Sequence, residues 1–466
     1  MSKMRCLHQN SQRVAGFYLV TIVVLSLLSL AALGVARFDH LIPGRSVMTP
    51  RFFGQLLGLH RVLLRDFVLW PTIPAVLGLG LLPKALKLRD VAFPRVALAS
   101  WVLFLFGGLS VMWAFLWGGI EPGWAHAVAS DLARPPSASM LLGLFFAGLA
   151  ALLVAVTLIA TVQERPPEER PIFARCLYGL AWIQALAGPV YLSTILLGLL
   201  QRQTGFHIFD PSYGGDARVL PTLYAFATAP LGPLIVLGCL GAVAATLRPE
   251  RVLAPGQLRL LGQFITAMAM LGLMAVDARA LPVAISARIG LMGAFFKTLW
   301  LIPLFALLVP LLQAAFTIPG RWSAARFYAF TTLCLIVLAA PLNVFLGLPA
   351  AAYFASGYLA SAADYLLLGG GCLLAMLAVL SEMKGGETPT RRAFGFVAAT
   401  VLLIGLATSI GPMVMLGKGG LGMEFAVYPD SFLVWQVLVL AGGSIFAVGL
   451  VLAGLALVGQ REAVAA

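Results

Sequence analysis

The sequence predicts an all-α membrane protein in which about twelve transmembrane helices form a single domain. Three observations indicate this fold class. The 466 residues are 61% hydrophobic, only 11% of them are charged, and the mean hydropathy is +0.97. Long apolar runs recur along the whole chain, and about 20 helical residues span the hydrocarbon core of a bilayer. Backbone polar groups inside a bilayer must find partners within the protein, which favours helices over irregular chain.

Twelve runs of apolar residues are long enough to be spans. The first run has the character of a signal-peptide core, but its 23 residues are too long for one. No soluble domain and no strong internal repeat interrupts the series, so we expect residues 1–466 to form one transmembrane domain. In chain order, the spans are expected at 14–36, 53–82, 93–119, 137–163, 174–200, 219–247, 255–276, 282–313, 325–347, 350–381, 391–416 and 431–458.

The net charge of +13 is explained by membrane topology rather than by nucleic-acid binding. With the N-terminus inside, and with residues near a span end counted with the adjoining loop, 19 of the 31 Lys and Arg residues lie on the inner side, nine on the outer side and three well within spans. An excess of Lys and Arg marks cytoplasmic loops. We therefore expect a multi-pass protein of the bacterial inner membrane with both termini in the cytoplasm, in contact with the lipid bilayer and not with nucleic acid.

The second span carries four ionisable residues in the stretch GLHRVLLRDF: His60, Arg61, Arg65 and Asp66. Charged groups inside a membrane are costly and mark candidate sites. Arg61 and Arg65 are four residues apart and share a helix face. His60 is the one histidine well inside a span, whereas a transition-metal site usually needs three or four ligands. A hydrogen-bonded core histidine is therefore the simpler interpretation. The remaining histidines are His8, His40, His126 and His207.

The sixth span contains TAPLGPLIVL, residues 228–237, with two prolines and a glycine within four positions. Proline removes a backbone donor and disturbs a helix interior. The stretch therefore predicts a helix break, which raises the question of a site there.

Further charges lie in and beside later spans, and each has a simpler interpretation as a buried, paired or snorkelling side chain. They are Asp277, Arg279, Arg288, Lys297 and Asp364. The five cysteines are scattered and form no CxxC motif, so no disulfide framework is expected. They are Cys6, Cys176, Cys239, Cys334 and Cys372.

Four stretches resemble subunit I of the haem–copper oxidases, the catalytic subunit of cytochrome c oxidase. TPRFFGQLLGLHRVLLRDF and LLPKALKLRDVAFPR resemble the family's second span and the loop after it. GFHIFDPSYGGDARVLPTLYAF is similar to the loop before the sixth span. AVDARALP and YPDSFLVWQVL resemble motifs before the eighth and at the last span. The resemblance implies the subunit I fold and a place in a respiratory electron-transport chain.

The resemblance also implies a ligand set, most of which this sequence lacks. His60 matches an axial ligand of the low-spin haem. The family's HFHY motif, with one further histidine for each haem, is matched by Ala362, Ala363, Asp364 and Tyr365.

The copper site has lost its ligands too. The histidine, glutamate and tyrosine of the family's GHPEVY motif are matched by Ala229, Leu231 and Pro233. The histidine pair that completes the copper site is matched by Ala267 and Met268.

The supporting machinery departs from the family pattern in the same way. The arginine pair that holds the haem propionates is matched by Met423 and Glu424. The lysine of the second proton pathway falls on Phe296, one residue before Lys297. Asp90 is retained as the vestigial entrance of the first pathway, but the asparagine beyond it is Ala97.

The resemblance therefore implies the fold and not the activity. We expect no catalytic residue, no copper and no haem, and a catalytically inactive structural or assembly partner of other respiratory-complex subunits. Three alternatives stay open: a single-haem protein using His60 with Met268 or Asp364 as second ligand, a transporter or channel in the same scaffold, and an active terminal oxidase subunit. Without haem, His60 is expected to face Asp364, with Arg61 or Arg65 as competing partners of that carboxylate. The haem volume is expected to be refilled in part by side chains.

Overall fold

The computed structural model describes residues 10–458 except 40, 43–46, 121–136, 205–207, 210, 217–218, 276–282, 349–350, 352–356, 384–387 and 424–426. Every regular element in this described part is helical. The first half contains α2 (Asn10–Asp39), α3 (Pro50–Val62), η1 (Leu63–Leu69), η2 (Thr72–Gly78), α4 (Leu79–Ala85), α5 (Pro94–Leu116), α6 (Ala138–Gln163), η4 (Pro167–Glu169), α7 (Ile172–Thr204), η5 (Pro211–Tyr213), α8 (Val219–Thr228) and α9 (Leu231–Leu247). The second half contains η6 (Pro249–Arg251), α10 (Pro255–Met274), α11 (Val283–Leu299), α12 (Leu301–Thr317), α13 (Ala324–Leu346), α14 (Tyr358–Asp364), η9 (Tyr365–Gly370), α15 (Gly371–Met383), α16 (Pro389–Lys418), η10 (Asp430–Phe432) and α17 (Leu433–Val458).

Twelve helical segments within the described residues are long and apolar enough to cross a membrane, which confirms the predicted number of spans. The helix ends are set by local signals. Thr49, Ser137, Ser323 and Thr388 each accept a hydrogen bond at the N-terminus of a helix through the side-chain oxygen. Such caps satisfy backbone donors that have no partner inside the helix. The cap at Thr49 explains why the second span begins at Pro50, three residues before the expected start.

The second span is one continuous helical segment that contains two π-helical parts, η1 and η2. Pro71 lies between the two parts and Pro74 lies inside η2. Proline cannot donate to the α-helical ladder, and neighbouring groups then pair differently. At Trp70 the backbone N–H donates to the carbonyl of Arg65, five residues back. π segments are rare and often lie at functional sites.

The sixth span is broken at Ala229 and Pro230, as TAPLGPLIVL predicts. Helix α8 ends at Thr228, Pro230 is the N-cap of α9, and Pro233 lies in the first turn of α9. The first four N–H groups of a helix have no intrahelical partner, so both prolines occupy positions where no ladder hydrogen bond is lost. The break is therefore a stable feature of the backbone.

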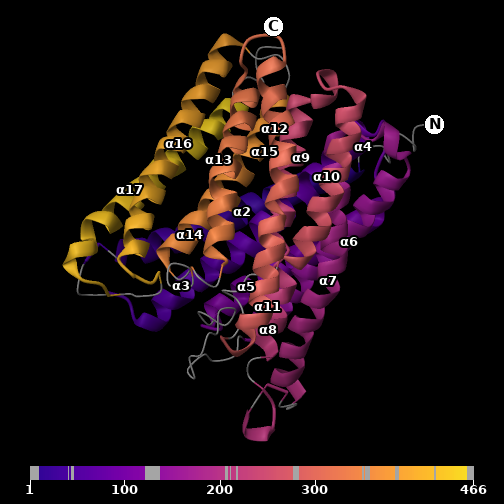
Figure 1. Ribbon diagram of the computed structural model, residues 1–466. Helices are drawn as coiled ribbons and strands as arrows, with labels where there is room; N and C mark the ends of the chain where they lie inside the picture. Colours follow the sequence, from indigo (N-terminus) through magenta and orange to yellow (C-terminus); the bar gives the residue numbers. More distant parts are fainter. Residues whose placement is uncertain are drawn as a thin grey trace.

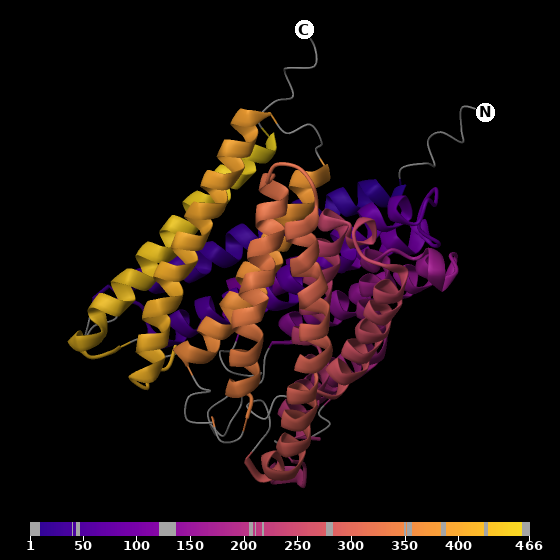
Figure 2. The same ribbon diagram turned by 45° about the horizontal axis from the view of Figure 1, so that its top comes forward.

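The helices form one bundle (Figures 1 and 2). Helices α16 and α17 pair along one edge of the bundle, drawn in orange and yellow. Glycines allow their backbones to approach closely. A side-chain carbon at Gly405 would collide with the backbone of Phe446, and one at Gly442 would lie 2.5 Å from the backbone nitrogen of Ser409. Small residues serve this purpose in membrane helix pairs.

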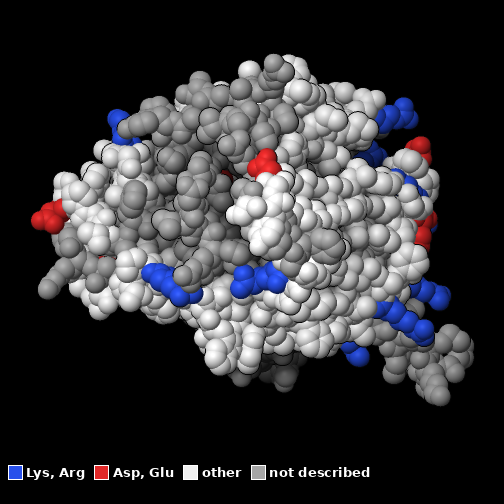
Figure 3. Space-filling model, turned by 90° about the horizontal axis from the view of Figure 1, so that it is seen from below, with Lys and Arg blue, Asp and Glu red and all other residues white. Residues whose placement is uncertain are grey.

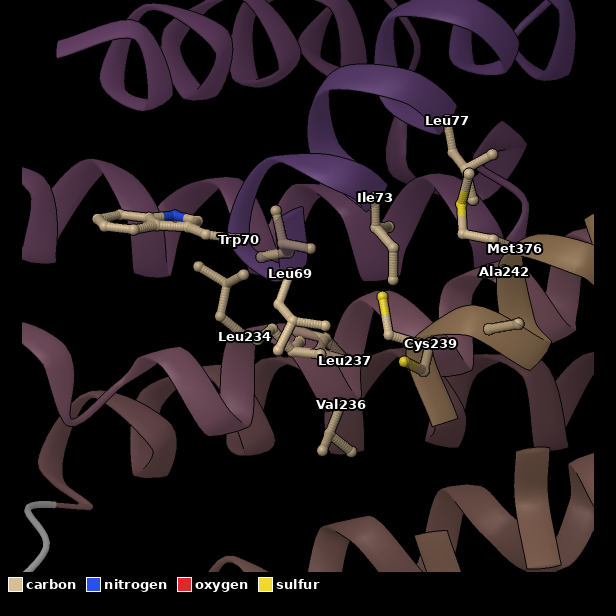
Figure 4. Close-up of a cluster of buried hydrophobic side chains, with 14 of the residues drawn as sticks. Leu69, Trp70, Ile73, Leu77, Leu234, Val236, Leu237, Cys239, Ala242 and Met376 are labelled. Carbon is tan, nitrogen blue, oxygen red and sulfur yellow. The ribbon is translucent and has the colours of Figure 1, made fainter. Parts of the chain in front are cut away.

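The centre of the bundle is built from the second span, α9 and α15. In Figure 4, Leu69, Trp70, Ile73 and Leu77 of the second span lie close to side chains of α9, with Met376 of α15 beside them. The labelled α9 residues are Leu234, Val236, Leu237, Cys239 and Ala242. All ten side chains are buried. The second span is thus held on the inside of the bundle, where its ionisable residues face other helices.

The outer faces of the peripheral helices are apolar. Val20 and Leu27 of α2 and Val434 and Val451 of α17 are each about three-fifths or more exposed. Seen from below, the charged side chains are few and separated, and most of the described surface in view is uncharged (Figure 3). Such surfaces suit a lipid environment. The integral, multi-pass character expected from the sequence is confirmed.

Candidate functional site around His60

His60 lies near the end of α3, is 1% exposed, and is held on one side by Ser29 of α2. Its Nδ1 atom lies 2.9 Å from the Ser29 hydroxyl oxygen and 3.1 Å from the Ser29 carbonyl oxygen. The same hydroxyl lies 3.2 Å from the His60 carbonyl oxygen and donates to it. A carbonyl can only accept, so this pattern places the proton of a neutral imidazole on Nδ1.

The other ring nitrogen of His60 faces Tyr365, the first residue of η9. The Tyr365 hydroxyl lies 2.7 Å from Nε2, and the ring centroids are 5.9 Å apart. With the proton on Nδ1, Nε2 accepts the hydrogen bond that Tyr365 donates. Both nitrogens of His60 therefore have protein partners. Arg61 and Arg37 add positive charge near the ring.

Asp364 has a different partner from the ones expected. Its Oδ1 accepts a hydrogen bond of 2.9 Å from the side-chain amide of Asn343 in α13. His60 bonds to Tyr365, the next residue along, and Arg65 forms its ion pair with Asp66 at 3.0 Å. Successive residues of a helix point about 100° apart, so one side chain of the Asp364–Tyr365 pair reaches His60 while the other reaches α13. The expected His60–Asp364 contact is therefore replaced by His60–Tyr365.

A second buried polar cluster joins three distant parts of the chain: Arg37 at the end of α2, Tyr358 at the start of α14, and Gln436 in α17. Arg37 donates to the Tyr358 hydroxyl, and its guanidinium carbon lies 4.8 Å from the centre of the Tyr358 ring. The Tyr358 hydroxyl and the Arg37 guanidinium reach Gln436 Oε1 at 3.0 Å and 3.4 Å. Sequence reasoning missed this cluster. The available signal was an arginine at the edge of the first span, which needs a polar partner if buried.

Haem does not fit the residues around His60. Ala362 and Met423 stand where the resemblance implied a haem-ligand histidine and a propionate-binding arginine. Both belong to one buried apolar cluster with Tyr358, Met413 and Leu416. An iron on Nε2 of His60 would have to displace the Tyr365 hydroxyl. Side chains thus fill part of this region, as expected for a densely packed interior.

Copper does not fit the residues at the break of the sixth span. Ala229, Ala267 and Leu231 carry no donor atom, and the fully buried Met268 offers a single thioether. Pro233 packs against α10, where a side-chain carbon at Gly272 would lie 2.7 Å from the Pro233 Cβ. Copper sites draw on several imidazole or sulfur ligands. Within the described ranges, no group of three His, Cys, Asp or Glu side chains lies close enough to bind a metal ion.

The remaining predicted positions are scattered. Asp90 lies in the loop before α5, where its Oδ1 accepts a hydrogen bond of 2.8 Å from the Val91 N–H. Lys297 points toward α13, since a side-chain carbon at Gly347 would lie 2.7 Å from its Nζ. Several other predicted positions lie outside the described residues: Asp277, Arg279 and Glu424, the side chain of Arg288, and the histidines His8, His40, His126 and His207.

The family model described as "Cytochrome C and Quinol oxidase polypeptide I" matches residues 13–445. Similar proteins include the "Cytochrome c oxidase subunit 1" of Thermostichus vulcanus, which is 26% identical over 48% of this chain and 42% of the relative. The "Probable cytochrome c oxidase subunit 1-alpha" of Streptomyces avermitilis is 30% identical over 43% of this chain and 36% of the relative. The "Probable cytochrome c oxidase subunit 1-beta" of Nocardia farcinica has the same values. The matched segments thus span only about two-fifths of these relatives.

Proposed function

The chain belongs to the cytochrome c and quinol oxidase polypeptide I family, and we propose that it is a cofactor-free member that supports the structure or assembly of a respiratory membrane complex. One observation carries the proposal. The nitrogen of His60 that would face a haem iron accepts a hydrogen bond from Tyr365 instead.

The distance between these two groups leaves no room for a metal ion. Imidazole–metal bonds are about 2.0–2.1 Å long in the well-characterised case of zinc. The Tyr365 oxygen is 2.7 Å from Nε2, so a metal ion between the two groups would need the tyrosine to withdraw. The hydrogen bond also occupies the lone pair that would bind the metal. The same histidine cannot serve both partners at once.

The rest of the ligand set supports the same conclusion. Reduction of oxygen in this family depends on two haems and a copper ion, and the matched positions hold alanine, leucine, proline and methionine. Retained fold and helix order beside this loss favour a scaffold role. The apolar outer faces of α2 and α17 offer surfaces for lipid or for other subunits. The Lys and Arg distribution supports a place in the bacterial inner membrane with both termini in the cytoplasm.

The decisive experiment on the cofactor is an absorption spectrum of the purified protein, recorded with and without dithionite, together with metal analysis. The chain would be produced in a host that supplies haem and copper to an intact oxidase made in parallel. We expect far less than one haem and one copper per chain. Stoichiometric haem would contradict the proposal, and loss of that haem in His60→Ala would then establish the single-haem alternative.

A second experiment addresses the scaffold role. The tagged chain would be recovered from detergent-solubilised membranes of its own host, and respiratory-complex subunits would be measured in wild-type and deletion strains. We expect such subunits to co-purify and their assembled complex to decline on deletion. Unchanged assembly on deletion would contradict a scaffold role. Solute flux in reconstituted vesicles above that of empty vesicles would favour the transporter alternative.

A further inference from the structure

A second ionisable site lies in the middle of the bundle, on η1, and it contains none of the positions matched to haem or copper ligands. The side chain of Asp66 has no exposed surface. Its carboxylate is paired with the neighbouring Arg65, whose Nη2 lies 3.0 Å from Oδ2 and whose Nε lies 3.3 Å from both oxygens. A buried carboxylate in a membrane protein is costly unless it is paired and hydrogen-bonded.

The groups around this ion pair come from three helical segments. The buried Tyr191 of α7 lies near the Asp66 carboxylate, and its hydroxyl has no hydrogen-bond partner among the described residues. The Arg65 guanidinium carbon lies 5.0 Å from the centre of the Tyr224 ring in α8. Trp70, one turn along the second span, stacks edge-on against Tyr191 with centroids 5.1 Å apart. Aromatic side chains therefore pack around the ion pair on the side of Asp66, while the Arg65 side chain keeps 27% of its surface exposed.

A small cavity of about 10 Å³ opens beside Asp66. Most of its lining is apolar, from Phe104, Ala147, Ala150, Ala151 and Val154 among others. Four side chains in the lining carry polar groups: Asp66, Trp70, Gln184 and Tyr18. A volume of roughly 10–15 Å³ available to a water centre holds about one water molecule.

Two of the polar groups in the lining have no hydrogen-bond partner among the described residues: the Trp70 indole N–H and the Gln184 side-chain carbonyl. Both residues are at least 97% buried. The Gln184 amide nitrogen is satisfied, since it donates to the Ala151 carbonyl. The Tyr18 hydroxyl is also satisfied, since it donates to Ser100 at 3.0 Å. A buried polar atom left without a partner costs about 1–3 kcal/mol, so native interiors rarely keep two of them at one cavity.

We propose that this cavity is a binding site for one water molecule, and that the water makes Asp66 a buried, exchangeable proton-binding site. The donor and acceptor inventory fits. A water can accept from the Trp70 N–H and donate to the Gln184 carbonyl and to the Asp66 carboxylate. These are three partners, the usual number for a buried water. Arg65 and Asp66 compensate each other's charge, so a neutral guest suits the cavity better than an ion.

The proton that binds to Asp66 is transferred by the same water molecule. A proton that reaches the water on one side lets the water donate one of its own protons to a carboxylate oxygen of Asp66, so that neutral water and a carboxylic acid remain. Release reverses this transfer and restores the ion pair with Arg65. We expect protons to reach the cavity from the side of Tyr18 and Ser100, whose hydroxyls are joined by a hydrogen bond.

The site is separate from the histidine site. Asp66 is six residues beyond His60, which corresponds to about 9 Å along a helix. The water site rests on its own cavity and does not depend on the proposed function. A protein that proved to bind haem at His60 could still carry this site.

The test is infrared spectroscopy of the purified full-length protein during a pH titration, in ordinary water, D₂O and ¹⁸O-labelled water. We expect a carboxylic-acid band that appears on titration and is lost in Asp66→Asn, and an ¹⁸O-sensitive band of an internal water that is lost or shifted in Trp70→Phe. Asp430→Asn, at the exposed start of the last span, is the matched control and leaves both bands unchanged.

Trp70→Phe keeps an aromatic ring and removes the N–H donor together with part of the ring volume. Its effect on the band of the internal water can be measured even if Asp66→Asn fails to fold. A high-resolution density map is expected to show a water peak within hydrogen-bonding distance of Trp70 Nε1 and Gln184 Oε1. A dry cavity in that map, or infrared bands identical in wild type and Trp70→Phe, would overturn the water site. A titration without a band that depends on Asp66 would overturn the proton site.

Discussion

The Tyr365 hydroxyl lies 2.7 Å from Nε2 of His60, and the carboxylate of the preceding residue, Asp364, bonds instead to Asn343. The tenth span thus presents a phenol to the histidine and a carboxylate to α13. His60 lies in α3, three residues before η1, and Tyr365 is the first residue of η9.

Removing the Tyr365 hydroxyl is expected to destabilise the protein. Tyr365→Phe leaves Nε2 of His60 buried without its donor, which costs about 1–3 kcal/mol. The measurement is thermal unfolding of the protein in detergent. The matched control is Tyr178→Phe, whose hydroxyl accepts a hydrogen bond from Gln163 in an exposed position and should change stability little. Equal stability of Tyr365→Phe and wild type would contradict the assigned hydrogen bond.

Breaking the Arg65–Asp66 pair from one side is expected to cost more than removing both charges. A fully buried carboxylate left without its partner typically costs about 3–5 kcal/mol, whereas apolar replacement of both partners is often close to neutral. The side chain of Asp66 has no exposed surface, so Arg65→Met should unfold at lower denaturant than the double variant Arg65→Met/Asp66→Leu. Additive effects of the two substitutions would show that the pair is not coupled.

Gln436→Leu is expected to weaken the junction of α2, α14 and α17. The substitution removes the amide oxygen that both Arg37 and Tyr358 reach, while keeping a side chain of similar size. A buried hydrogen-bonding group that loses its partner costs about 1–3 kcal/mol. Proteolysis near Tyr358 should accelerate along with the loss of thermal stability. An unchanged proteolysis pattern would argue against the junction.

A side chain at Gly405 is expected to separate α16 from α17. Gly405→Val would place its side chain against the backbone of Phe446, and overpacking of this kind costs about 1–3 kcal/mol or more. Gly443→Ala on α17 is the matched control, because no atom lies within 4 Å of the added carbon. We expect that control to stay within about 1 kcal/mol of wild type. If Gly405→Val unfolds at the same point as wild type, the close packing of α16 against α17 would be contradicted.

The number and order of the spans could be predicted because each depends only on a long apolar run. The ends depended on smaller signals. Thr49 extended the second span by three residues, and the tenth span begins at Tyr358 rather than at 350. The break at Pro230 followed from the chemistry of proline alone.

The partners in the site could not be predicted because they depend on helix rotation and on contacts between distant segments. A shift of one residue turns a helical side chain by about 100°, which separates Asp364 from Tyr365. Arg37 and Tyr358 are 321 positions apart, and nothing local to either residue identifies the other. Asp66 stood out as a buried charge, but its cavity depends on Gln184 and Tyr18 from two other helices.

The π segments in the second and tenth spans let these helices absorb a change in length. A π turn contains one residue more than an α turn closed at the same place, so the loss of a single residue from Leu63–Leu69 would convert η1 to α-helix. The part of the span beyond that deletion would keep its orientation relative to His60, whereas the same loss from a regular α-helical part would turn it by about 100°. One codon lost within η1 would therefore leave the side chains that line the interior unchanged, and one codon lost elsewhere in the span would not.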